Sequence, residues 1–144
     1  MDNNNITGVA PTPSADLDCF DTRTLSEEGV EMELKALKTG RGSGAYIKLL
    51  GMDSERFMSI VDERAREITE RASRSITTDY TPTERMERTA DLCARCTIGW
   101  RGLAKGGVDI THSVQAARQL YLDYPAIRDQ VNEFIGERSN FIKA

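Results

Sequence analysis

The chain has 144 residues and a mass of 16.0 kDa, which fits one domain of ordinary size. Hydrophobic residues make up 39% of it, and together with the glycines they reach the share typical of a folded, soluble protein. The formal net charge is −4 and the pI is near 5.1, which excludes a uniformly basic nucleic-acid-binding surface.

The acidic charge is concentrated in the N-terminal quarter of the chain. The first 33 residues carry eight acids and one base, Arg23, for a net charge of −7, so the remainder of the chain is +3. The acids of this region are Asp2, Asp16, Asp18, Asp21, Glu27, Glu28, Glu31 and Glu33.

Neither a membrane span nor a secretion signal is expected. No apolar stretch approaches the roughly 18 residues that cross a bilayer, and no basic start leads into an apolar run near the N-terminus. The three cysteines, Cys19, Cys93 and Cys96, are too few and odd in number for the disulfide framework of a small secreted protein. We therefore expect a cytosolic protein with free thiols and no membrane partner.

Residues 1–16 are predicted to form a flexible N-terminal arm. Their Asn, Thr, Ser, Pro and Asp residues cannot bury enough apolar surface to offset the entropy of ordering. The next segment, from Leu17 to Leu25, has Phe20 as its only aromatic residue, and its sequence leaves its structure open. Residues 17–144 are expected to form a single α+β domain, with a β-hairpin in residues 29–52 and a mainly helical part in residues 53–144.

The hairpin is predicted from an alternating pattern. Val30, Met32 and Leu34 alternate with charged residues, which is the period of a half-buried strand. Glycines at positions 40, 42 and 44 suit a turn, and the β-prone run Ala45–Leu50 follows them. Because an isolated hairpin is only marginally stable in water, it must pack on the helices or extend a sheet with a partner.

A long amphipathic helix is predicted after Asp53 and Ser54, either of which can cap its N-terminus. We expect its apolar side to face the core and its charged side, which mixes both signs, to face solvent. The apolar positions are Phe57, Ile60, Val61, Ala65, Ile68, Ala72 and Ile76.

Three further helices complete the expected fold. The second begins at a capping box that starts with Thr81. We expect its backbone to loosen at Gly99 and Gly102 and the run to end at Gly106-Gly107. A third begins at Thr111 or Ser113, and a fourth begins at Pro125, a residue that suits the first turn of a helix. The apolar face of the second helix would consist of Met86, Ala90, Cys93, Ala94 and Thr97, and Leu92, Ile98 and Trp100 would make this face wider. The fourth helix would bury Ile127, Val131, Phe134, Ile135, Phe141 and Ile142.

Few residues are candidates for chemistry. Cys93 and Cys96 form a Cys-x-x-Cys pair, and Cys19 and His112 would complete the four ligands of one zinc ion. Because both cysteines of the pair lie within a predicted helix, small buried side chains are favoured over a zinc or redox site. No recognisable nucleophile motif accompanies His112, and no pair of catalytic carboxylates can be singled out. We therefore expect no catalytic, metal-binding or cofactor-binding residues and no enzymatic activity.

The glycine-rich turn carries a local basic patch. The segment Gly40–Gly44 lacks the Lys-Ser/Thr ending of a phosphate-binding loop, so a turn is favoured. Residues 35–48 hold four basic residues and no acid, and they could meet an acidic partner surface, nucleic acid or the acidic first 33 residues, within one chain or between copies. For Trp100 and Tyr121, core packing is favoured over a role as exposed binding anchors. The candidate partner-binding residues are Lys35, Lys38, Arg41, Tyr46, Lys48, Trp100 and Tyr121.

Several short segments between residues 18 and 144 occur in a distinctive order. They are Gly29-Val30 before the turn Lys38–Gly40, Leu50–Ser54, Leu92–Ala94, Thr97–Gly102, Ala117 to Tyr121, Tyr124–Val131, Phe134-Ile135 and Arg138–Phe141. This order resembles the tail assembly chaperones encoded in the tail modules of tailed bacteriophages and prophages. The resemblance is most specific from Ala117 to the C-terminus.

The resemblance implies a non-enzymatic protein that binds the tape measure protein or the tail tube protein during tail morphogenesis in the host cell cytoplasm. The alternative is a virion structural component, such as a tail or connector protein retained in the phage particle. A nucleic-acid-binding regulator is a weaker alternative, because the net charge of −4 disfavours it. In the implied role, the hairpin edge and an apolar helical surface would cover client segments reversibly.

Overall fold

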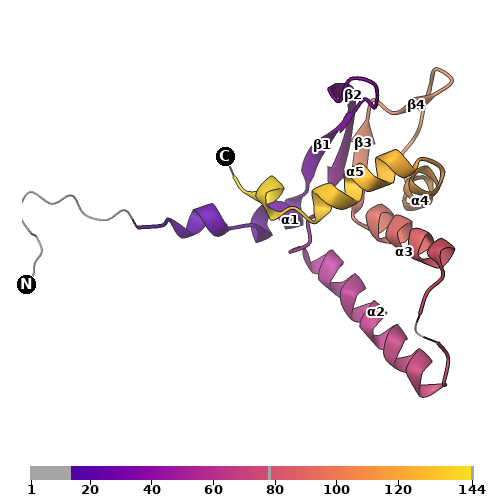
Figure 1. The fold of residues 1–144 in the computed structure, drawn as a ribbon. Coiled ribbons are helices and arrows are strands. Elements are labelled where there is room, and N and C mark those ends of the chain that lie inside the picture. The colour runs from indigo at the N-terminus through magenta and orange to yellow at the C-terminus, as the bar shows by residue number, and fades with distance from the viewer. Residues whose placement is uncertain (1–13, 78, 144) are drawn as a thin grey trace, which may run out of the picture.

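The computed structural model of the protein describes residues 14–77 and 79–143. Of the arm expected at residues 1–16, residues 1–13 therefore lie outside the described part. The fold is α+β, with a small antiparallel sheet covered by helices (Figure 1). None of the helices in the described ranges is both long and apolar enough to cross a membrane.

A three-stranded antiparallel sheet with the order β1-β2-β3 forms the centre of the fold. The expected hairpin supplies β1 (Val30–Lys35) and β2 (Gly42–Leu49), and β3 (Thr97–Arg101) pairs with the other edge of β2. Met32 and Trp100 lie on either side of Ile47 as its partners in the two neighbouring strands. The hairpin is therefore stabilised by extension of the sheet within the same chain.

The third strand replaces the end of the predicted second helix. Helix α3 (Pro82–Arg95) begins at the predicted capping box but ends well before Trp100. After the C-cap residue Cys96 come the β-branched Thr97 and Ile98 and then a glycine, and this composition disfavours a helix. The expectation that Thr97, Ile98 and Trp100 belong to a helix is thus wrong, and these residues lie in the sheet.

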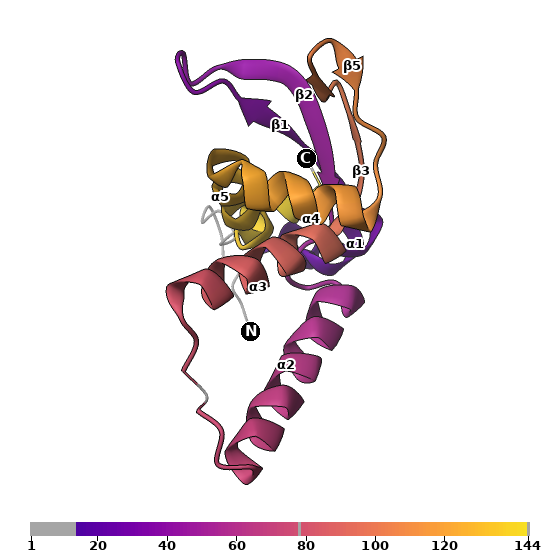
Figure 2. The same cartoon turned by 90° about the vertical axis from the view of Figure 1, so that its right-hand side faces the viewer.

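Three helices pack on one face of the sheet: α3, α4 (Val114–Asp123) and α5 (Pro125–Ile135) (Figure 2). A short hairpin of β4 (Ala104–Lys105) and β5 (Val108–Asp109) connects the sheet to α4. The core between the sheet and these helices contains Met32, Leu34, Ala45, Ile47, Leu49, Ala90, Cys93, Ala94, Ala117, Leu120, Tyr121, Val131 and Ile135.

Short helical segments lie near both ends of the described chain. The 3₁₀ turn η2 (Leu17–Phe20) and helix α1 (Arg23–Glu28) precede the sheet, and the 3₁₀ turn η3 (Arg138–Phe141) follows α5. The predicted fourth helix was expected to reach Phe141, but α5 ends before Gly136, a residue of low helix propensity. Phe141 is nevertheless fully buried, because η3 folds back onto the body of the domain.

Asp53 joins three parts of the chain beside the start of α2 (Glu55–Ser73). Its carboxylate accepts two hydrogen bonds from the Arg138 guanidinium, at 2.8 and 2.9 Å, and one from the Thr22 hydroxyl at 2.6 Å. These hydrogen bonds lower the pKa of Asp53 to about 2, and the bonds from Arg138 have the largest effect. The cap of α2 is Ser54, whose hydroxyl oxygen accepts a hydrogen bond from the Phe57 N–H at 3.2 Å.

Candidate partner-binding surfaces

Helix α2 projects from the body of the domain and diverges from α3 (Figure 2). The expectation that its apolar side is buried is wrong for most of the helix. Ile60 is fully buried and Phe57 is half-buried, whereas the remaining apolar positions are exposed. The side of α2 that contacts α3 is mainly polar.

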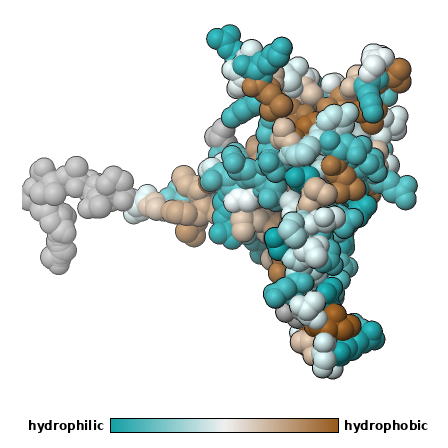
Figure 3. Space-filling model, turned by 45° about the vertical axis from the view of Figure 1, so that its right-hand side comes forward, coloured by the Kyte–Doolittle hydropathy of each residue, from teal (hydrophilic) through white to brown (hydrophobic). Residues whose placement is uncertain are grey.

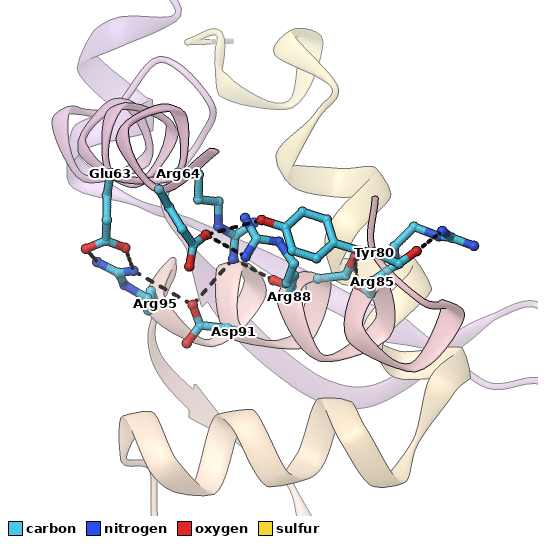
Figure 4. A network of polar contacts seen from close by, with 9 residues as sticks. Glu63, Arg64, Tyr80, Arg85, Arg88, Asp91 and Arg95 are labelled. Carbon is cyan, nitrogen blue, oxygen red and sulfur yellow. Dashed lines mark hydrogen bonds and ion pairs between the residues drawn. The ribbon is translucent and has the colours of Figure 1, made fainter. Parts of the chain in front are cut away.

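Ion pairs connect this polar side to α3 (Figure 4). Arg88 of α3 donates to Glu67 Oε1 at 2.7 Å, and Arg95 donates to Glu63 Oε2 at 2.6 Å. A third contact has its donor on α2 instead of α3: the Arg64 guanidinium donates a hydrogen bond to the backbone carbonyl of Arg88 at 2.7 Å. The guanidinium of Arg88 holds the pKa of Glu67 below its usual value, and that of Arg95 does the same for Glu63. Both carboxylates are therefore ionised at neutral pH.

Tyr80, in the connection between α2 and α3, completes this contact. Its ring lies beside the guanidinium groups of Arg88 and Arg71, whose central carbons are 4.1 and 4.9 Å from the ring centroid. Arg71 also donates two hydrogen bonds to the Thr77 carbonyl, at 2.7 and 3.0 Å. Much of the charged side that the sequence assigned to solvent thus holds the helix in place.

The exposed apolar side of α2 forms a continuous stripe, which we call the outer stripe. Its members follow one another at spacings of three and four residues, so they share one side of the helix. The same spacing forms the seam along which helices pack in coiled coils. Met58, Val61 and Ile68 are 49%, 51% and 41% exposed, and Figure 3 shows a hydrophobic patch near the far end of this projecting part. The outer stripe consists of Met58, Val61, Ala65, Ile68 and Ala72.

The predicted basic patch of residues 35–48 is divided between two places. Lys35, Lys38 and Arg41 are exposed at the end of the hairpin where β1 turns into β2, and we call them the tip cations. Lys48 lies opposite Glu31 in the sheet and is one of the charges that lower the pKa of Glu31, after the hydrogen bond from Arg101. Of the four basic residues in the predicted patch, the three tip cations therefore stay together, and the Glu33 carboxylate lies at the same end of the hairpin, where it accepts a hydrogen bond from the Gly44 N–H at 3.0 Å.

The aromatic candidates lie in three different environments. Tyr46 is on the outer face of the sheet, with the guanidinium carbon of Arg101 3.9 Å from its ring centroid. Trp100 is half-buried on the core face, and its indole N–H donates to the Ile110 carbonyl at 2.7 Å. Tyr121 is fully buried, so it belongs to the core and offers no surface to a partner.

An apolar groove of about 470 Å³ lies between the hairpin and the start of α5, and we call it the tip groove. Gln130 of α5 fixes one wall: its side-chain amide accepts from the Lys35 N–H at 2.8 Å and donates to the Lys35 carbonyl at 3.1 Å. No sequence pattern pointed to this groove, because its lining comes from separate parts of the chain. The apolar lining includes Leu34, Leu37, Ala45, Leu103, Tyr124 and Ile127.

The candidates for metal or nucleophile chemistry are buried or far apart. Cys93 and Cys96 are fully buried, and burial raises the pKa of their thiols to about 12 and about 11. Cys19 is exposed in η2, and His112 packs edge-on against Trp100 with ring centroids 4.9 Å apart. Within residues 14–77 and 79–143, no group of three or more His, Cys, Asp or Glu side chains could hold a metal ion.

No model of a protein family matches the chain, and searches of curated proteins and of solved structures find no match either. The features that bear on function are therefore the surfaces described above and the order of the sequence segments.

Proposed function

We propose that this protein is a tail assembly chaperone of a tailed bacteriophage or prophage, which binds the tape measure protein in the host cytoplasm and performs no catalysis. The order of segments in residues 18–144 supports this proposal through its family resemblance. The outer stripe is the observation that most directly supports this proposal. Its exposed Met, Val, Ile and Ala side chains recur at helical spacing, so they can pack against an apolar helical segment of a client protein.

The packing of α2 suits reversible binding. A tape measure protein exposes apolar helical segments before tube subunits enclose it, and a second helix laid along them removes apolar surface from water on both partners. Ion pairs such as Glu67 to Arg88 hold the charged side of α2 against α3, so the outer stripe is presented without rearrangement. Release of the client likewise leaves the core closed, because the outer stripe is not part of it.

The β-hairpin is less suitable for client binding than its sequence suggested. Its second strand is the central strand of the sheet, and Ile47 and Leu49 are fully buried. Removing the hairpin would therefore remove part of the core. A tail tube protein, the alternative client, would instead be expected to pair with one of the two edge strands of the sheet, β1 or β3.

Co-purification tests the proposed client. The chain, either as wild type or as the double variant Val61→Glu/Ile68→Glu, is co-expressed with the tape measure and tail tube proteins of the phage that the proposal implies. We expect the double variant to lose the tape measure protein while retaining its circular dichroism spectrum, because both substituted side chains are exposed. The matched control is Ser59→Glu, which adds a carboxylate at an exposed position of α2 outside the outer stripe and should retain the client.

Two results would count against the proposal. Undiminished recovery of the tape measure protein with Val61→Glu/Ile68→Glu would contradict the role of the outer stripe. Mass spectrometry of purified virions supplies the second test, because a chaperone should be scarce in the particle. Recovery at the copy number of a tail subunit would favour the alternative function, a tail or connector protein retained in the virion.

A further inference from the structure

The 3₁₀ turn η2 exposes two large apolar side chains. Leu17 is 81% exposed and Phe20 is 67% exposed. Residues three apart eclipse each other in a 3₁₀ helix, so both lie on one side of η2, and we call them the arm pair. The turn is capped by Asp16, whose side chain accepts from the Asp18 N–H at 3.0 Å. Figure 3 shows this apolar surface on the segment that projects beside the grey residues.

Acidic side chains surround the arm pair. Asp16, Asp18 and Asp21 are all exposed, and within residues 14–77 and 79–143 none of them takes part in an ion pair. Lys143 lies near Asp21, whose pKa its charge helps to lower after the hydrogen bonds from Thr24, and it lines one pocket with Asp18 and Asp21. The segment therefore combines two apolar anchors with three carboxylates and one nearby cation, an excess of negative charge that suits an apolar surface edged by cations.

The tip groove has this complementary character. Its lining is mainly apolar and includes the exposed side chains of Leu37 and Tyr124. Of the tip cations, Lys35 lines the groove, and Lys38 and Arg41 belong to the turn that follows the lining residue Leu37. In the part of the chain that the structure describes, none of the three forms an ion pair with a carboxylate. Asp123 also lines the groove, and its carboxylate accepts a hydrogen bond from the Gln119 side chain at 2.8 Å.

The arm of the same chain points away from this groove. In Figure 1, η2 leaves the domain beside α1, whereas the hairpin tip lies at the opposite end of β1. The short link between η2 and α1 is fixed by Asp21, whose carboxylate accepts from the Thr24 N–H at 3.2 Å and from the Thr24 hydroxyl at 2.7 Å. The groove is thus open to the arm of another copy.

We infer that η2 of one copy docks in the tip groove of a second copy. The arm pair lies against Leu37 and Tyr124, and Asp18 faces the tip cations. The two surfaces in contact are different, so the association is head to tail and either closes into a ring or continues as a chain. The contact is independent of the proposed client site, because the outer stripe takes no part in it.

Sedimentation velocity of the purified full chain over a concentration series tests this contact. We expect the wild type to associate, and the association to weaken as salt rises, because the charged groups are exposed. Leu17→Ser/Phe20→Ser should weaken association at least about tenfold, since the burial of two apolar anchors is lost. The matched control is Val108→Ser, which changes a side chain of similar exposure, 70%, in the β4–β5 hairpin and should associate like the wild type.

A charge swap tests the orientation of the contact. Asp18→Lys and Lys38→Glu should each weaken association, and the two together in one chain should restore it, whereas Lys105→Glu in β4 should have no effect. Any of three results would overturn the inference. They are a wild type that stays monomeric, a Leu17→Ser/Phe20→Ser variant that associates like the wild type, and a double charge-swap variant whose association is not restored. None of these results alters the co-purification of the tape measure protein, which tests the proposed function separately.

Discussion

Asp53 links three segments that lie far apart in the sequence: Thr22 before α1, the start of α2, and Arg138 in η3. Its side chain is largely buried, whereas that of Arg138 is 61% exposed. An exposed ion pair alone would contribute little, but hydrogen bonds from two partners favour the ionised carboxylate and lower its pKa to about 2. The contact therefore makes the stability of the fold depend on pH in the acid range.

We expect Asp53→Asn to lower the free energy of unfolding at neutral pH by at most about 2 kcal/mol, the equivalent of its pKa shift. Because the pKa is lowered in the folded state, this stabilisation is complete above the unfolded value, near 3.8, and is lost as the pH falls through about 2. Urea denaturation at a series of pH values measures it, and wild type and variant should converge in acid. An equal difference at neutral and acid pH would show that the carboxylate charge is not the cause.

Two hydroxyl groups meet in the core at Thr97 and Tyr121. Their oxygens are 2.7 Å apart, and the Thr97 hydroxyl also lies 2.7 Å from the Cys93 carbonyl, to which it donates. A hydroxyl has a single proton, so the Tyr121 hydroxyl donates to Thr97. Burial raises the pKa of Tyr121 well above its usual value, which keeps this donor protonated.

Thr97→Val should therefore destabilise the protein more than Tyr121→Phe. The first change leaves the buried Tyr121 hydroxyl without an acceptor and should cost about 2 kcal/mol, whereas the second leaves Thr97 bonded to Cys93 and should cost about 1 kcal/mol. Urea unfolding of both variants measures the two values. The reverse order would mean that the proton lies on the other oxygen.

At the scale of single elements, α2 shows how far helical periodicity predicts structure. The pattern correctly predicts the helix and a cap at Asp53 or Ser54, and it identifies which side is apolar. It carries no information on which side a neighbouring helix meets. Here α3 meets the charged side through pairs such as Glu63 to Arg95, so the core residues predicted on α2 are mostly surface residues.

The strands of the sheet could be predicted only where the sequence pattern that identifies them lies within one short stretch of the chain. Alternation in β1 and the glycines of the turn lie within one short stretch, so the hairpin could be identified. The third strand follows α3 almost directly, and it is defined by pairing with β2, as between Ile47 and Trp100. The tip groove depends in the same way on segments that only the folded chain brings together.

The orientation of α2 predicts unequal costs for two chemically identical substitutions. Ile60→Ala should lower the free energy of unfolding by about 2–4 kcal/mol, because this side chain is fully buried. Ile68→Ala should change it by less than about 0.5 kcal/mol, because Ile68 lies on the exposed outer stripe and alanine is a good helix former. Urea denaturation of the isolated protein compares them directly. Equal costs would show that the outer stripe is covered in the free chain.

At the scale of the whole molecule, one core joins the sheet to α3, α4 and α5, while α2 and η2 project from it (Figure 1). The outer stripe and the arm pair hold apolar side chains that this core does not use. Binding surfaces and core are thus largely separate, and substitutions at the surfaces can be examined in a folded protein. The reactivity of the two buried cysteines reports the opening of the core separately from changes at these surfaces.

Cys93 and Cys96 should react with a thiol reagent only when the whole core opens. Both are fully buried, and their raised pKa values, about 12 and about 11, keep the thiols un-ionised at neutral pH. In a Cys19→Ser background, which removes the exposed thiol, both should be labelled at one slow rate that rises with urea in step with global unfolding. Val61→Glu/Ile68→Glu should leave this rate unchanged, because the outer stripe lies outside the core. Fast labelling of Cys96 alone would instead mean that the junction of α3 and β3 opens locally, and the sheet and helices would then not unfold as one unit.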